Sequence, residues 1–387
     1  MSQQDDFVYL DHAATTPMRQ VAIDAMLPFL ADRFANPSGS HRFAREARRA
    51  VDDARDQVAA VIGCLPGEVV FTSGGTESDN AAISGAVWRH RGLPVCPAAE
   101  HHGVLNVVER HDGRVVGVDA FGRADPDALA RALDDDVAIV SVMAVNNEVG
   151  SINDLAAVSQ IVRDRVPNAL LHTDAVQAAS WLDLREIWPN VDLLSLSAHK
   201  FGGPKGVGVL AFRKGVQIAP LIVGGGHERD RRSGTHNVPG IVAMAAALVA
   251  TDAERADESR RITSLRDRLI GGLGGSLDGV RETVPSAVKV PGGAHICVEG
   301  VESESLLFLL DDANVCASAA SACASGATER SHVLAAMGVE PEAAAGALRM
   351  TLGRTTTGAD VDRAIDVLVE AISTLRSRKS PAAATRS

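Results

Sequence analysis

The chain has 387 residues, of which 46% are hydrophobic and 22% charged, and its formal net charge is −11. Its length predicts two or three structural units, and its apolar fraction excludes a wholly disordered protein. The acidic balance disfavours nucleic-acid binding through a basic surface. The N-terminal sequence MSQQDDFVYLDH lacks the pattern of a secretory signal, and no apolar run is long enough to cross a bilayer. We therefore expect a cytoplasmic protein that binds neither membranes nor nucleic acid directly.

Helices and strands alternate along the first two thirds of the chain. Apolar residues at helical spacing predict a helix over 41–62 that ends at Gly63. Further helices are expected near 153–165 and 237–250. Short apolar runs without alternation predict strands buried on both faces, and an α/β unit with a mostly parallel sheet. These strands are expected at 69–72, 137–142, 170–173, 193–197 and 207–212.

The pattern changes after about residue 255. The stretch 256–268 is strongly charged with an apolar stripe, and short strands and helices then mix until a final amphipathic helix over 361–375. We expect a large α/β domain over residues 13–256. A smaller α+β domain is expected over residues 257–387, joined by residues 1–12.

Two polar residues stand at the ends of predicted strands. Lys200 follows the strand in LLSLSAHKF, where a lysine can form a Schiff base with a carbonyl cofactor. The alternative is a solvated lysine in the loop before Gly202. Asp174 closes the strand in LLHTDAVQ, which predicts either the partner of a pyridinium nitrogen or the N-cap of a helix.

The segment FTSGGTESDN at 71–80 places two glycines between a strand and a helix. Backbone N–H groups at the positive end of that helix would form a phosphate site. The alternative is an ordinary strand-to-helix turn. The segment lacks the GxxxxGK[ST] pattern and is therefore not a Walker loop.

The chain has five cysteines, an odd number that indicates no disulfide framework. None of them forms a CxxC pair, so we expect no structural zinc site. The segment ASAASACASGATER at 317–330 predicts a mobile loop with Cys323 at its centre. An exposed cysteine on such a loop is a candidate nucleophile, and the alternative is an incidental surface thiol. Cys316, just upstream, has the pattern of a strand residue.

Together these segments resemble the cysteine desulfurases, a class-V aminotransferase group among the fold-type I pyridoxal-phosphate enzymes. The loop around Cys323 has the length typical of the nitrogen-fixation and housekeeping iron–sulfur desulfurases. The continuation ASGATERS departs from the acidic residue and proline of many relatives, and Gly75 stands where alanine is common. The matching segments run in the family's order from YLDHAATTP to LRMTLGR, through NPSGSH, FTSGGTESDN, AEHHGVLN, VNNEVG, HTDAVQ, SAHKFGGPKGVG, GGGHERDRRSGTHN and SACASG.

The resemblance implies pyridoxal 5'-phosphate as cofactor and a role for each matching residue. Lys200 would hold the cofactor covalently, and Asp174 would pair with its ring nitrogen. Gln177 would bond its phenolic oxygen, while His101 would stack on the ring and assist proton transfer. The residues implied to hold the phosphate are Gly75, Thr76, Ser197 and His199, joined by Thr235 from the partner subunit of a homodimer.

The resemblance also implies how L-cysteine is bound. Asn36 and Asn147 would position the substrate, with Asn147 also touching the cofactor. Arg349 would bind the substrate carboxylate through its planar guanidinium, and Cys323 would accept the sulfur. No metal ion is implied.

The implied reaction converts L-cysteine to L-alanine and leaves a persulfide on Cys323. The persulfide would supply an acceptor protein, either an iron–sulfur scaffold, a tRNA-thiolation protein or a DNA-modifying system. One alternative is a selenocysteine lyase or another class-V aminotransferase-like enzyme, although an aminotransferase would not need Cys323. Another is a sulfur carrier or scaffold without turnover, which would not need Lys200 and Asp174.

Overall fold

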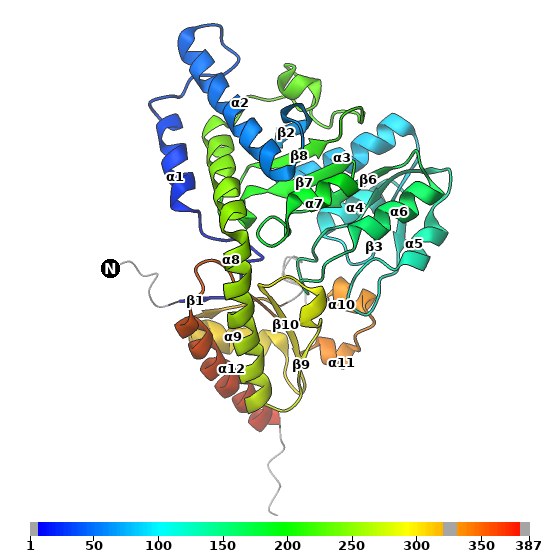
Figure 1. Ribbon diagram of the computed structural model, residues 1–387. Helices are drawn as coiled ribbons and strands as arrows, with labels where there is room; N and C mark the ends of the chain where they lie inside the picture. Colours follow the sequence, from blue (N-terminus) through cyan, green and yellow to red (C-terminus); the bar gives the residue numbers. More distant parts are fainter. Residues whose placement is uncertain (1–6, 320–330, 380–387) are drawn as a thin grey trace, which may run out of the picture.

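A seven-stranded sheet forms the centre of the larger part of the molecule, in a computed structural model that describes residues 7–319 and 331–379 (Figure 1). Its strand order is β2-β8-β7-β6-β5-β3-β4, and only β8 runs antiparallel to its neighbours. The expected α/β unit with a mostly parallel sheet is therefore confirmed. The strands are β2 (Val69–Thr72), β3 (Leu93–Pro97), β4 (Arg114–Val116), β5 (Val137–Ser141), β6 (Leu170–Asp174), β7 (Leu193–Ser197) and β8 (Gly208–Phe212).

Burial on both faces explains the composition of the central strands. Every residue of β5, β7 and β8 is buried, so no polar face alternates with an apolar one. All five predicted strands are present. The strands β3 and β4 escaped prediction because LPVCP contains two prolines and RVV is only three residues long.

Helices cover both faces of this sheet (Figure 1). The predicted first helix is α2, which begins after His41 and ends at Gly63 with a left-handed φ of 82°. Its apolar face packs in the main core, whereas α3 and α4 pack on the opposite face against residues such as Ile139 and Leu193. The helices around the sheet are α2 (Arg42–Ile62), α3 (Gly75–His90), α4 (His102–Arg110), α5 (Pro126–Ala132), α6 (Leu155–Arg165) and α7 (Leu184–Ile187).

One long helix, α8 (Val238–Ser276), joins the two parts of the molecule (Figure 1). It covers both the helix expected at 237–250 and the charged stretch at 256–268, because its Ala, Glu and Arg residues are good helix formers. Its first half buries Ile241 and Leu248 in the main core, and its second half buries Ile262 and Leu269 in a second core. The expected domain boundary at 256/257 falls inside this helix, and the domain limits stay a prediction.

The smaller part is built on an antiparallel sheet in the order β12 (Ala347–Thr351), β10 (Gly293–Val298) and β9 (Val280–Glu282). The helices α9 (Ser303–Asp312) and α12 (Gly358–Lys379) pack against its core. Strand β1 (Val8–Tyr9) pairs with β11 (Val315–Cys316), so Cys316 is in a strand as predicted. Across residues 7–319 and 331–379 no helix is both long and apolar enough to cross a membrane. Other elements are α1 (Gln20–Met26), η2 (Leu27–Phe29), η5 (Ala198–Lys200), η6 (His227–Asp230), α10 (His332–Ala336) and α11 (Pro341–Ala344).

Candidate active site

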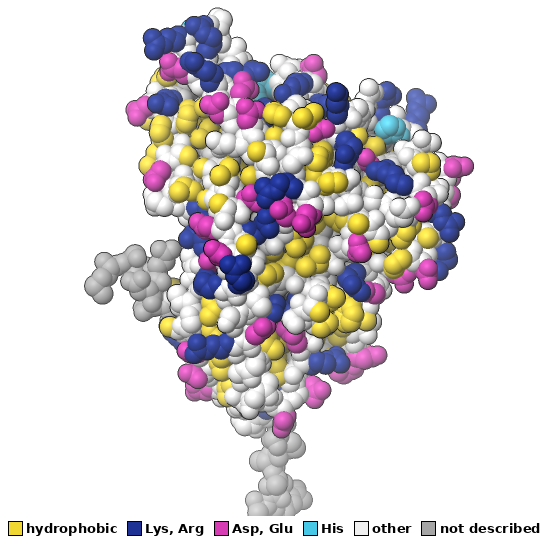
Figure 2. Space-filling view, viewed as in Figure 1, with side chains coloured by type: hydrophobic (Ala, Val, Ile, Leu, Met, Phe, Trp, Pro, Cys, Tyr) yellow, Lys and Arg dark blue, Asp and Glu magenta, His cyan; other side chains and the backbone are white. Residues whose placement is uncertain are grey.

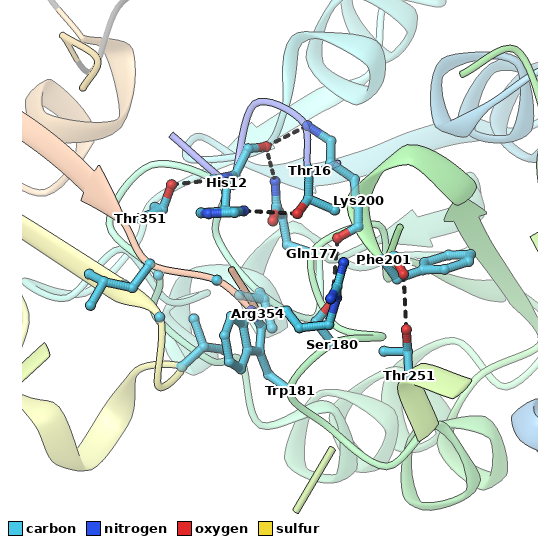
Figure 3. Close-up of a pocket in the computed structure, with 18 of the residues that line it drawn as sticks. His12, Thr16, Gln177, Ser180, Trp181, Lys200, Phe201, Thr251, Thr351 and Arg354 are labelled. Atoms are coloured by element: carbon cyan, nitrogen blue, oxygen red, sulfur yellow. Dashed lines mark hydrogen bonds between the residues drawn. The ribbon is translucent and has the colours of Figure 1, made fainter. Parts of the chain in front are cut away.

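Lys200 lies at the end of the short turn η5, directly after strand β7. Its Nζ donates hydrogen bonds to the carbonyl oxygens of Ala13 at 2.5 Å and Ala14 at 2.9 Å. The Nε2 of Gln177 donates to the same Ala13 oxygen at 2.8 Å (Figure 3). The N-terminal segment thus brings two predicted cofactor residues together, and Lys200 is half-buried and hydrogen-bonded rather than solvated.

Asp174 is the last residue of β6 and is buried. Its Oδ1 accepts a hydrogen bond from the backbone N–H of Val176 at 2.8 Å. No helix begins there, since the next one is α7 at Leu184, so the N-cap alternative is wrong. Burial raises the pKa of Asp174, and the nearby His101 and Lys200 charges counteract it. A buried carboxylate of this kind is stabilised by a positive partner.

His101 caps the N-terminus of α4 beside these residues. Its Nδ1 accepts a hydrogen bond from the backbone N–H of Gly103 at 2.9 Å, which leaves the proton of the neutral ring on Nε2. Burial lowers the pKa of His101, and the positive charges of Lys200 and His102 lower it further. The negative charge of Asp174 acts in the opposite direction but does not outweigh them. The structure therefore groups His101, Asp174 and Lys200, with a neutral imidazole at neutral pH.

The predicted phosphate turn lies against the end of β7. A Cβ atom added to Gly75 would lie 2.7 Å from Val176 Cγ2 and 3.7 Å from Ser197 Cβ, so the turn accepts glycine and little more. Helix α3 begins at Gly75, and Thr76 is its second residue. Free N–H groups at such a helix start favour an anion. Gly75, Thr76 and Ser197 are therefore brought together.

His199 lies in the short turn η5, which follows β7. Its Nδ1 lies 3.1 Å from the Oγ1 of Thr15. Burial lowers the pKa of His199 to about 4, with added effects of the Lys200 and Lys205 charges. The ring is thus neutral at neutral pH, and it lies two residues after Ser197 in the chain.

Arg349 lies buried on β12 in the smaller part of the molecule. Its Nη2 pairs with Asp11 Oδ1 at 2.7 Å, and its Nη1 donates to the Asn147 carbonyl at 3.1 Å. Its buried Nε has no hydrogen-bond partner among the residues that the structure describes. A guanidinium with an unused donor can take a carboxylate. The two predicted substrate residues Arg349 and Asn147 are in contact.

Asn36 and Thr235 lie elsewhere, on exposed loops. The Asn36 side chain accepts a hydrogen bond from the backbone of Ser38, whose Oγ lies 3.2 Å from His227 Nε2 on the loop that carries Thr235. The two predicted residues are therefore on neighbouring loops, but neither joins the group around Lys200 within one chain. Cys323, the predicted nucleophile, lies outside the described residues.

A cavity adjoins Lys200 between the larger and smaller parts (Figure 3). Lys200, Gln177 and Asn147 line it together with His12 and Trp181. The other predicted cofactor residues do not line it, nor does Arg349. The cavity therefore lies next to the predicted site, and the Lys200 side chain belongs to both.

The structure adds a buried acid network that sequence reasoning missed. Asp79 on α3 lies 3.6 Å from His172 Nε2, which is also 2.9 Å from the Oγ of Ser195. Burial raises the pKa values of Asp79 and Glu100, and the charge of Asp174 raises both further. The only signal available for Asp79 was an acid just before the small and apolar run AAISGAV. In the part of the chain that the structure describes, no three His, Cys, Asp or Glu side chains are placed to hold a metal ion.

Comparison with known proteins matches nearly the whole chain. The profile of the class-V aminotransferases covers residues 8–364. A cysteine desulfurase IscS of Methanosarcina thermophila is 40% identical over 384 residues, which cover 97% of this chain and 94% of that protein. An IscS-like cysteine desulfurase of Mycobacterium tuberculosis is 43% identical over 393 residues, covering 97% and 98%.

Solved structures agree with the sequence comparison. A NifS-like protein is 34% identical, with a TM-score of 0.88 over 95% of this chain and all of that chain. The structure of SspA in complex with cysteine is 28% identical, with a TM-score of 0.78 over 89% of this chain and 98% of that chain. By profile, sequence and fold, this chain belongs to the cysteine desulfurases of the class-V aminotransferase family.

Proposed function

We propose that this protein transfers the sulfur of L-cysteine to Cys323 as a persulfide and releases L-alanine. The observation that carries the proposal is the grouping of Lys200, Asp174 and His101 at one edge of the sheet. The N-terminal segment links this group to Arg349, because Ala13 accepts from Lys200 and Asp11 pairs with Arg349. Binding of cysteine by the similar SspA supports the choice of substrate.

We propose pyridoxal 5'-phosphate as the cofactor, because the donor set fits it. The buried carboxylate of Asp174 suits a positive ring nitrogen, and the tight turn at Gly75 suits a phosphate. When bound, the cofactor supplies an electron sink for negative charge at the substrate Cα. The residues that would hold it are Lys200, Asp174, Gln177, His101, Asn147, Gly75, Thr76, Ser197 and His199, with Thr235 from a partner subunit.

The protein's own residues orient the substrate and move its protons. Arg349 and Asn147 bind the carboxylate, which places the Cα hydrogen toward Lys200. Lys200 Nζ takes that proton, and the neutral ring of His101 assists proton transfer. The Cβ–S bond then breaks as the Sγ of Cys323 bonds to the departing sulfur. Cβ gains a proton, and Cα regains the proton that Lys200 removed. Cysteine and one thiol are thereby converted to alanine and one persulfide.

The exposed positions of Asn36 and Thr235 support a homodimer. Their neighbouring loops carry exposed apolar side chains, with Phe34 72% and Val223 76% exposed. Hydrophobic side chains also spread over α1 and the adjacent stretch of α8 (Figure 2). In the dimer, Thr235 of each chain would complete the phosphate site of the other. We further propose a cytoplasmic enzyme whose persulfide passes to an iron–sulfur scaffold or a thiolation enzyme.

Mass spectrometry after a pulse of L-cysteine tests the reaction. The holoenzyme should carry one extra sulfur atom on the peptide that contains Cys323, with one alanine formed for each. Cys323→Ser should bind cysteine but form neither product, because a serine hydroxyl is hardly ionised near neutrality. Cys316→Ser, on strand β11, is the matched control and should keep most of the activity. Alanine turnover in Cys323→Ser would contradict the proposal, and faster turnover of selenocysteine would favour a selenocysteine lyase.

A further inference from the structure

The described residues on either side of the segment that carries Cys323 are held by one small cluster. On the upstream side, the backbone of Ser318 exchanges two hydrogen bonds with that of Arg349, at 3.1 and 2.8 Å. On the downstream side, the Oγ of Ser331 donates a hydrogen bond to the carboxylate of Glu148. Glu148 follows Asn147, whose carbonyl accepts from Arg349 at 3.1 Å. The contact of Ser318 upstream and that of Ser331 downstream therefore both lead to Arg349 and the turn 147–148.

The contact between Glu148 and Ser331 is buried, and both hydrogen-bonding roles of the Ser331 hydroxyl are used. Glu148 is only 4% exposed, and an ionised carboxylate is costly to bury unless it is hydrogen-bonded. Ser331 is the N-cap of α10, and its Oγ also accepts from the backbone N–H of Leu334 at 3.0 Å. The hydroxyl thus has one donor and one acceptor partner. Ser331 ties the helix start to a buried charge.

Apolar packing surrounds this bond. Val333 and Leu334 of α10 lie in one buried cluster with Val149, next to Glu148, and with Cys297 of β10. The start of α10 is therefore packed against the turn that carries Glu148. The position of Ser331 relative to Arg349 follows from this packing and from the Glu148 hydrogen bond.

We propose that Glu148 is a positioning residue, which fixes Ser331, and with it the downstream attachment of the Cys323 segment, relative to Arg349. This inference rests on the proposed function, in which Arg349 binds the substrate carboxylate and Cys323 takes its sulfur. The hydrogen bond between Glu148 and Ser331, here called the anchor, would set the distance between the bound substrate and the start of α10. Loss of the anchor should slow sulfur transfer without loosening the cofactor.

Protonation of Glu148 would weaken the anchor near neutral pH. Burial raises the pKa of Glu148 to about 7. The hydrogen bond from Ser331 and the positive charge of Arg349 lower it, but burial has the larger effect. The groups that face it are Arg349 on β12, itself paired with Asp11, the Cys297 thiol on β10, and Ser331 at α10. The ionised carboxylate is the stronger acceptor for the Ser331 hydroxyl. The anchor should therefore be firmest above pH 7.

Single-turnover persulfide formation on Cys323 in the holoenzyme tests this inference. Glu148→Gln and Ser331→Ala should each slow it on the order of tenfold at pH 8, as expected for losing a hydrogen bond to a charged group. The ratio of wild-type to Glu148→Gln rates should shrink toward pH 6, and this ratio cancels the ionisation of Cys323 itself. The cofactor absorbance and the KM for L-cysteine should stay unchanged.

Two further variants separate positioning from folding. Ser331→Thr keeps a capping hydroxyl and should retain most of the rate. Ser303→Ala removes a hydroxyl that bonds to the carbonyls of Ala345 and Ala347 at the start of α9, and serves as the matched control. Alkylation of Cys323 by iodoacetamide in the holoenzyme without cysteine should change in Glu148→Gln and Ser331→Ala but not in these two variants.

Wild-type transfer and alkylation rates in Glu148→Gln and Ser331→Ala would overturn the inference. So would an equal loss in Ser303→Ala, or a loss of cofactor absorbance that parallels the loss of rate. If the wild-type enzyme forms no persulfide on Cys323, the proposed function fails. The alkylation comparison then still decides whether Glu148 positions the segment.

Discussion

Arg55 and Glu228, which are 173 residues apart in the sequence, form a buried ion pair through two hydrogen bonds of 2.7 Å each. The same carboxylate accepts from His236 Nε2 at 2.6 Å and from the backbone N–H of Phe71 at 3.1 Å. One side chain thus ties α2, β2 and the loop that carries Thr235. Residues 228–230 have φ values of 49°, 58° and 63°, which non-glycine residues rarely adopt. The ion pair holds a strained loop in place.

Replacement of Glu228 should therefore destabilise the protein strongly. Glu228→Gln leaves the Arg55 guanidinium buried without its counter-charge, at a cost of about 3 kcal/mol in the free energy of unfolding. Urea denaturation of the holoenzyme measures this loss. Glu46→Gln is the control, because Glu46 pairs with Arg42 on the surface and should change the stability by less than about 0.5 kcal/mol. Equal effects of the two variants would contradict the buried role of the pair.

The Glu228 contribution should also depend on pH. Burial alone would raise the pKa of Glu228, but Arg55 and His236 hold it at about 2, below its ordinary value of 4.5. The stabilisation is therefore complete above pH 4.5 and is lost as the pH falls toward 2. The difference in unfolding free energy between the wild type and Glu228→Gln should shrink over that range. A constant difference from pH 7 to pH 3 would show that the charge of Glu228 is not what stabilises the loop.

Lys200→Ala should abolish both the visible absorbance of the cofactor and the production of alanine. The reason is that Lys200 is the lysine placed beside Asp174 and His101, where its charge acts on both. Spectra before and after borohydride reduction measure covalent attachment of the cofactor. Lys205→Ala changes an exposed lysine five positions later and should behave as the wild type. A cofactor still fixed by borohydride in Lys200→Ala would mean that another lysine holds it.

Thr235→Val should lower the affinity for the cofactor on the order of tenfold, the effect of one lost hydrogen bond to a charged phosphate. Mixing it with Lys200→Ala tests whether sites are shared between subunits. A hybrid dimer would contain one site with both Lys200 and the partner's Thr235. At a cofactor concentration that leaves Thr235→Val largely empty, activity should therefore rise on mixing. Light scattering should show a dimer. No recovery on mixing, or full activity of a monomer, would exclude the shared site.

The sequence alone determined five strands of the seven-stranded sheet and the order of the chemical motifs. Strands such as β5 and β7 were predictable, because a strand buried on both faces needs a continuous apolar run. The turn after β2 was predictable because Gly74 and Gly75 interrupt such a run. These features depend on neighbours within a few residues, so the local sequence contains them.

Only the tertiary structure decided which of these residues meet. Lys200 contacts Ala13 across 187 positions, Arg349 contacts Asp11 across 338, and Ser331 contacts Glu148 across 183. The continuity of α8 across the expected domain boundary and the separation of Thr235 from Lys200 also had no local signal. Such contacts depend on how crossovers and packed helices return the chain to the same edge of the sheet. No residue spacing specifies that return, because it is fixed by the burial of both cores together.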